Sequence, residues 1–193
     1  RRFPIAAQET ALTLNTRCFE AGLESFPAVL AQLETGLQPR AQAAGLGRMH
    51  RRADRPAAMG RIDFAQTPEA VVRLVRALDH GRYWNPLATA KIDTGSRVLN
   101  VGSAEPAEGS AAPGTVLSHD GDTALIATAD AAVRLQFLGE LPQVGTVIAT
   151  LAAQDRARLT GLAAGAAKHD GWWRKRLAAM NPAVLPGEGS GES

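Results

Sequence analysis

The feature that most constrains the fold is a helix start signal at Thr67 and Pro68, near the middle of the chain. The Thr67 side chain can accept a backbone N–H of the first turn, Pro68 stands where no N–H is needed, and Glu69 meets the positive end of the helix dipole. Apolar residues then recur at a helical spacing, at Val71, Leu74, Val75 and Leu78. The sequence therefore predicts an amphipathic helix that packs against a second layer.

Short segments of strand character follow this helix, each bounded by turn residues. We expect strands at 87–92, 97–101, 115–118, 123–128, 133–137 and 146–151, with a loop over 105–114. Asp120 and Gly121 mark a hairpin turn, and apolar and polar residues alternate through 133–137. This pattern predicts the α+β class, with a small closed or nearly closed antiparallel β-barrel capped by the helix.

The first 37 residues predict two helices. The first starts near Ala11, with Gln8 or Thr10 as its cap, and Gly22 marks its end. Ser25 caps a second helix, which stops at Gly36. The first sixty residues contain no convincing sheet for these helices to cover. Cys18, the only cysteine, is expected to be buried, and a lone thiol excludes an internal disulfide and fits a reducing cytoplasm.

Residues 38–60 contain glycine, proline and arginine without a sustained apolar period, which indicates a basic linker. An arginine cluster lies in and beside it, at Arg40, Arg48, Arg51, Arg52, Arg55 and Arg61. Two interpretations stay open: a solvated connector without a ligand, or an electrostatic contact with a phosphate-bearing partner.

Two further regions bear on function. The turn at 80–85 contains His80, Arg82, Tyr83 and Trp84. The favoured interpretation is that Tyr83 and Trp84 pack the helix onto the barrel, and the alternative is that they contact a substrate.

From residue 152 the chain becomes helical again, with Leu159 and Leu162 on the inward face of the helix, and the tail is expected to be disordered. Asp120 and Asp122 are too few ligands for calcium.

Three passages resemble the methionyl-tRNA formyltransferase family, in the form found as a domain of nonribosomal peptide synthetases. Residues 2–5 with 9–21 are similar to the last strand and closing helix of its catalytic domain. Residues 61–64, 75–78 and 113–117 are similar to its C-terminal subdomain, an open, OB-like barrel. Residues 172–174, with Leu177 and Leu185-Pro186, are similar to the lead-in of a condensation domain.

The resemblance implies a division of the chain into four parts. Residues 1–37 would end the catalytic domain, 38–60 would be the basic linker, 61–151 the C-terminal barrel subdomain, and 152–193 a helical linker towards a condensation domain with a disordered tail. Because the chain begins without Met, we expect it to be a piece of a longer protein. The family's catalytic Asn, His and Asp would precede Arg1, so no catalytic residue and no metal ligand is assigned here.

The resemblance also implies a function. The parent protein would N-formylate an aminoacyl group held on the phosphopantetheine arm of a peptidyl carrier protein, with 10-formyltetrahydrofolate as the donor. This fragment alone would be inactive and bind no cofactor. Its candidate substrate-binding residues are Arg48, Arg51, Arg52, Arg55, His80, Arg82, Tyr83 and Trp84. The alternatives are an RNA-binding barrel of a tRNA formyltransferase and a structural spacer. No membrane partner is expected, because no apolar run approaches the roughly 20 residues that cross a bilayer.

Overall fold

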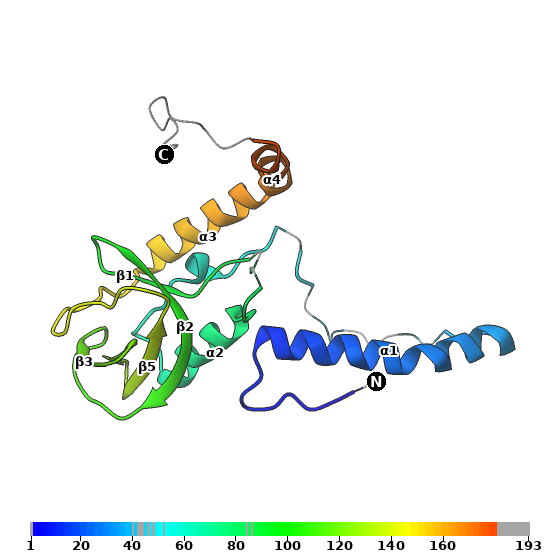
Figure 1. Cartoon of the computed structure of the whole chain (residues 1–193), viewed down its shortest axis with the longest axis horizontal. Coiled ribbons are helices and arrows are strands. Elements are labelled where there is room, and N and C mark those ends of the chain that lie inside the picture. The colour runs from blue at the N-terminus through cyan, green and yellow to red at the C-terminus, as the bar shows by residue number, and fades with distance from the viewer. Residues whose placement is uncertain are drawn as a thin grey trace, which may run out of the picture.

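The computed structural model describes residues 2–39, 41, 45, 47, 49–51, 53–83, 85 and 87–180. Its elements, in chain order, are α1 (Ala11–Thr35), η1 (Ala57–Gly60), α2 (Pro68–Leu78), β1 (Lys91–Asp93), β2 (Val98–Ala107), β3 (Val116–Asp120), β4 (Thr123–Ala127), β5 (Ala132–Phe137), α3 (Ala153–Ala167) and α4 (Asp170–Ala178). The strands and α2 form a central body, from which α1 projects on one side while α3 and α4 extend on another (Figure 1). In the described part of the chain, no helix is long and apolar enough to cross a membrane.

The five strands form one antiparallel sheet in the order β1-β2-β5-β4-β3. The predicted strand at 146–151 is wrong, because this segment makes only an isolated bridge between Val147 and Thr115. The predicted loop at 105–114 is also wrong at its start, since β2 continues to Ala107 and pairs there with Ala132. The sheet is therefore open, and its β3 edge is covered by a loop where a sixth strand was expected.

Helix α2 packs on this sheet as its sequence predicts. The Thr67 hydroxyl accepts the N–H of Ala70 at 3.4 Å, and Pro68 occupies the first turn. The apolar face of α2 is buried against β2 and β5, in a core that includes Val71, Val72, Val75, Leu78, Phe64, Ile92, Ile126 and Leu135. We call η1, α2 and the five strands, with the loops that join them and residues 138–151, the sheet domain.

Helix α1 is a single helix, so the predicted break between two helices is wrong. The Ser25 hydroxyl does not cap a second helix; it donates to the carbonyl of Ala21 at 2.8 Å within the same helix. Thr10 is the N-cap, paired with Thr13. Cys18 is exposed, contrary to the prediction of burial. An apolar stripe stays exposed along the helix, at Phe19, Leu23, Phe26, Val29, Leu30 and Leu33.

Helix α3 is attached to the sheet domain by polar contacts near its start. The Arg156 guanidinium donates to the carboxylate of Asp63, whose side chain is only 8% exposed. The Thr160 hydroxyl accepts the backbone N–H of Ala58 at 2.9 Å. Ala163 faces the sheet domain, whereas Leu162 is 57% exposed, so its predicted inward orientation is wrong. The contact rests on small residues and polar groups.

One polar atom in the core of the described residues has no hydrogen-bond partner, the hydroxyl of Thr128. A Thr128→Val substitution keeps the shape of the side chain and removes the unpaired group. We expect it to raise the free energy of unfolding by about 1 kcal/mol. Urea unfolding followed by circular dichroism measures this change.

The matched control is Thr123→Val, because the Thr123 hydroxyl donates to the carbonyl of Asp120 at 2.7 Å. That variant should lose stability. A loss at Thr128 as large as the loss at Thr123 would show that the Thr128 hydroxyl is also bonded.

Candidate functional site

The turn that follows α2 is built by side chains that bind backbone groups. The Asp79 carboxylate accepts the N–H of Gly81 at 2.7 Å, and the Asn85 side chain donates to the carbonyl of Leu78 at 2.8 Å. Gly81 has a φ of 59°, and a Cβ there would lie 2.7 Å from the Leu12 side chain of α1. The backbone conformation of the turn therefore favours glycine, whereas the contact is with the end of the Leu12 side chain, which can rotate away.

Of the predicted substrate-binding residues on this turn, the structure describes His80, Arg82 and Tyr83. Tyr83 is 72% exposed, so the interpretation that it packs α2 onto the barrel is wrong. Arg82 is exposed and His80 is half-buried, while Trp84 lies outside the described residues. An exposed tyrosine beside an arginine can stack on a ligand and hydrogen-bond with it.

The predicted linker arginines are described only in part. Arg48 and Arg52, together with Arg40, lie outside the described residues. Arg51 is exposed, and its backbone N–H donates to the Asp54 carboxylate at 2.7 Å. Arg55 is half-buried and lines a cavity with Leu87, directly after the turn. The structure thus brings one linker arginine close to the end of the turn.

A cavity of about 650 Å³ lies between the N-terminal segment, the start of α1 and the outer face of α2. Its walls are mostly apolar, with charged residues at Glu9, Glu69, Arg73 and Arg76. Its volume falls in the range of small-molecule sites, roughly 300–1,000 Å³. The sequence did not reveal this cavity, because residues 5–14 and 69–77 are far apart in the chain and the local signals in each stretch indicate helices, not a shared pocket.

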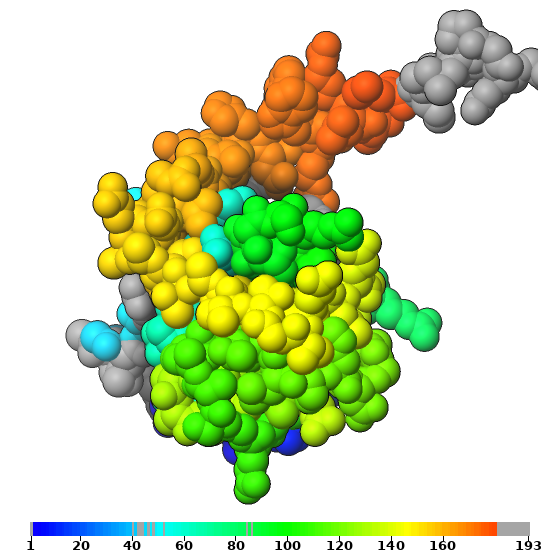
Figure 2. Space-filling model, turned by 90° about the vertical axis from the view of Figure 1, so that its left-hand side faces the viewer, coloured from blue at the N-terminus to red at the C-terminus, as the bar shows by residue number. Residues whose placement is uncertain are grey.

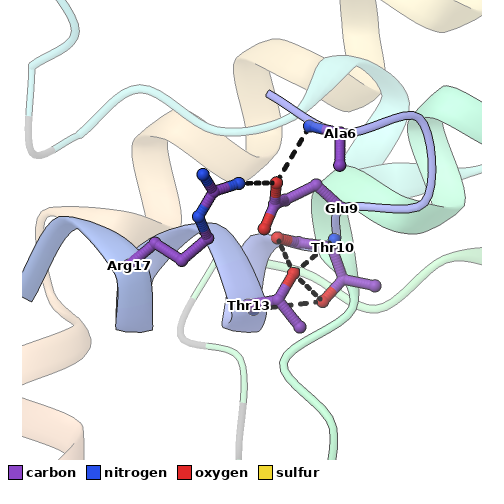
Figure 3. Close-up of polar contacts among 5 residues, drawn as sticks. All are labelled: Ala6, Glu9, Thr10, Thr13 and Arg17. Carbon is purple, nitrogen blue, oxygen red and sulfur yellow. Dashed lines mark hydrogen bonds and ion pairs between the residues drawn. The ribbon is translucent and has the colours of Figure 1, made fainter. Parts of the chain in front are cut away.

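Polar contacts hold the N-terminal segment against α1 and α2. The Glu9 carboxylate accepts the N–H of Ala6 at 3.0 Å and pairs with Arg17 at 2.6 Å (Figure 3). Arg76 of α2 donates to the carbonyl of Ala7 and, at 2.6 Å, to the Gln8 side chain. Glu9 and Arg76 are therefore engaged in framing the cavity. Among the described residues, no group of three His, Cys, Asp or Glu side chains could hold a metal ion.

The Glu9 contacts predict a pH dependence at this junction. The hydrogen bond from Ala6, followed by the contacts with Arg17, lowers the pKa of Glu9 from its usual value of 4.5. A carboxyl whose pKa is lowered by folding stabilises the folded state above its unfolded pKa and loses that contribution as the pH falls through the folded pKa. We expect amide exchange at Ala6 to accelerate as the pH falls below 4.5, after correction for the intrinsic pH dependence of exchange.

Glu9→Gln should remove this dependence, because the glutamine amide does not titrate although its oxygen can still accept the N–H of Ala6. Glu20→Gln, on the exposed surface of α1, is the control and should leave it unchanged. If Glu9→Gln kept the wild-type profile, Glu9 would not be the group that titrates.

The central part of the chain matches a known family. Residues 56–140, which span η1, α2 and all five strands, match the family described as formyl transferase, C-terminal domain. The methionyl-tRNA formyltransferase of Pseudomonas syringae pv. tomato is 34% identical over 140 residues, covering 72% of this chain and 42% of the relative. That of Chromobacterium violaceum is 31% identical over 134 residues, covering 69% of this chain and 41% of the relative.

These comparisons support a formyltransferase-like family, with the sheet domain in the place of its C-terminal domain. The chain spans about two fifths of the length of the curated relatives it matches. The turn residues His80, Arg82 and Tyr83 fall inside the matched region, whereas the N-terminal part of the cavity precedes it.

Proposed function

We propose that this chain is the acceptor-side part of a formyltransferase domain in a nonribosomal peptide synthetase. In this proposal it positions an aminoacyl group, held on the phosphopantetheine arm of a peptidyl carrier protein, for N-formylation from 10-formyltetrahydrofolate. The catalytic groups belong to an α/β domain that ends in residues 1–37. Residues 152–193 then lead towards a condensation domain, and the protein works in the cytoplasm.

The match to the formyl transferase C-terminal domain supports the general role, and the charge of the strand region, residues 91–151, carries the choice of acceptor. Residues 91–151 contain three basic residues and seven acidic ones. Arg97 pairs with Glu140, and Arg134 lies 3.7 Å from Asp120. An RNA site needs several cations available to phosphates. An acidic strand surface whose arginines are already paired favours an acceptor with few phosphates, such as a carrier protein.

A direct binding comparison tests this proposal. The 193-residue chain is titrated with a peptidyl carrier protein in its phosphopantetheinyl form, and separately with bulk tRNA, at several salt concentrations. We expect binding of the carrier, weaker binding of its form without the arm, and a tRNA affinity that is low at physiological salt. Failure to bind the carrier in either form would overturn the proposal.

Binding of tRNA as an aminoacyl acceptor is the second candidate, because the relatives are named methionyl-tRNA formyltransferases. Described basic residues outside the strands include Arg51 and Arg55 in the linker and Arg73 and Arg76 in α2. A salt dependence of tRNA binding that indicates several phosphate contacts would favour this candidate. A chain that binds neither partner would be a structural spacer.

A further inference from the structure

A second cavity, of about 210 Å³, lies where α3 crosses η1 and β1. Two positively charged residues, Arg55 and Lys91, line it together with one acid, Asp170. The rest of the wall is apolar, formed by Met59, Leu87, Ala88, Ala163, Ala166 and Ala167. The space-filling view shows how α3 and α4 extend beyond the rounded body of strands and loops, so this cavity lies at the junction of two parts of the molecule (Figure 2).

The backbone of β1 places Lys91 at this junction. Ile92 is fully buried in the core, so Lys91 and Asp93 point to the opposite face of the strand. Asp93 is paired there with Arg61 at 3.1 Å. Because Ala163, Ala166 and Ala167 of α3 have small side chains, space remains beside Lys91. Larger side chains at these three positions would fill the cavity.

The ammonium group of Lys91 has no counter-ion among the described residues. No ion pair or hydrogen bond joins it to Asp170 or to any other described side chain. The side chain is half-buried, and burial lowers the pKa of Lys91. A desolvated cation without a partner is costly, and an anion in the cavity would offset that cost.

The size of the cavity limits what it can hold. Small-molecule pockets begin at roughly 300 Å³, so a cavity of about 210 Å³ suits a single charged group and not a whole nucleotide or cofactor. A phosphate group fits both the volume and the charge. Arg55 adds a second positive charge to the wall, and cationic side chains form strong, charge-assisted hydrogen bonds with phosphate oxygens.

We infer that this cavity binds a phosphate group of the acceptor carrier, with the Lys91 ammonium as the principal contact and Arg55 as the second cation. The inference rests on the proposed function for the identity of the carrier. The phosphodiester of a phosphopantetheine arm and that of RNA share the relevant chemistry. Asp170 repels an anion and therefore weakens the binding of free phosphate. Tight binding then needs further contacts between this chain and the rest of the carrier.

The inference is tested by titrating the 193-residue chain with inorganic phosphate and with phosphopantetheine, following amide resonances of β1 and α3. Lys91→Met keeps the length of the side chain and removes its charge, and it should weaken binding at least tenfold. Lys91→Arg should keep the affinity within a few fold. Asp170→Asn removes the repulsion and should tighten binding several-fold.

These variants separate the site from a purely structural lysine. If Lys91→Met and Asp170→Asn both left the affinity unchanged, the inference would be overturned. Thermal unfolding of each variant shows that it is folded, and Asp170→Asn provides a test in the opposite direction should Lys91→Met not fold. An affinity that responds equally to Arg134→Met, on β5 and outside this cavity, would indicate general screening and also overturn it.

Two further arms identify the source of the phosphate. The phosphopantetheinyl carrier should lose affinity with Lys91→Met, whereas the carrier without its arm should not respond. If tRNA binding responds instead, the phosphate comes from RNA and the carrier assignment is overturned. If inorganic phosphate binding depends on Lys91 but neither macromolecule binds, the site stands and the proposed function fails.

Discussion

Gly114→Ala should destabilise the sheet domain by at least about 3 kcal/mol, because the site lacks room for a side chain. Gly114 is buried, with a φ of 88°, and an added Cβ would lie 2.1 Å from the carbonyl oxygen of Ile148. That contact is with backbone, which cannot swing aside like a flexible side chain. Relief requires breaking the hydrogen bonds that flank it, from Gly114 to Ala127 at 2.8 Å and from Ile148 to Gly114 at 2.9 Å.

Gly121→Ala is the matched control for this prediction. Gly121 has a φ of 59° at the tip of the β3–β4 hairpin, and nothing lies within 4 Å of an added Cβ. Gly121→Ala should lower the free energy of unfolding only by the cost of the left-handed backbone conformation, about 1–2 kcal/mol. Urea unfolding of both variants measures the difference. Equal losses would mean that backbone conformation alone, and not the contact with Ile148, accounts for the effect.

The hydrogen bonds at Gly114 also explain why the strand predicted at 146–151 does not form. Residues 145–148 bind β3 and its approach through single bonds, from Gly145 to Val116 at 2.9 Å and from Val116 to Thr146 at 2.9 Å. Within this stretch Ile148 is buried while Val147 is 59% exposed. The apolar composition suggested a regular strand, but a loop with one anchoring side chain fulfils the same role.

The fold was most predictable where local signals agreed with one another. At α2, the cap, the proline and the apolar period all indicated the same helix, and Thr67, Val71 and Leu78 take the predicted places. At α1 the local signals conflicted with the structure. Ser25 could cap a helix or bond to the preceding turn, and sequence alone does not decide between these two uses.

The candidate sites were less predictable than the fold, because they are formed by residues that are distant in the chain. Tyr83 and Arg82 could be proposed from a polar, aromatic turn. Lys91 could not, because its role depends on the distance between β1 and α3 and on the small size of Ala163. A lysine in a short strand next to a buried isoleucine carries no local sign that a helix will cover it.

Arg156→Ala should destabilise the attachment of α3 by about 2 kcal/mol. The substitution leaves the buried Asp63 carboxylate without its charged partner, keeping only the N–H of Ala65 at 3.1 Å. Removing one partner of a buried pair costs about 3–5 kcal/mol in full burial, and the 37% exposure of the Arg156 side chain lowers that figure here. Amide exchange in α3 measures the effect, and it should accelerate more than exchange in β5.

Arg158→Ala is the control, because Arg158 lies on the same helix, 3.7 Å from Asp155, and both side chains are exposed. Exposed pairs contribute about 0–1 kcal/mol, so this variant should leave α3 exchange nearly unchanged. Asp63→Asn, alone and combined with Arg156→Ala, completes a double-mutant cycle. The loss of stability in the double variant should be smaller than the sum of the losses in the two single variants, because Asn needs no counter-ion. Additive losses would show that α3 is held by Thr160 and the apolar contacts alone, and the cavity at Lys91 would then not depend on this ion pair.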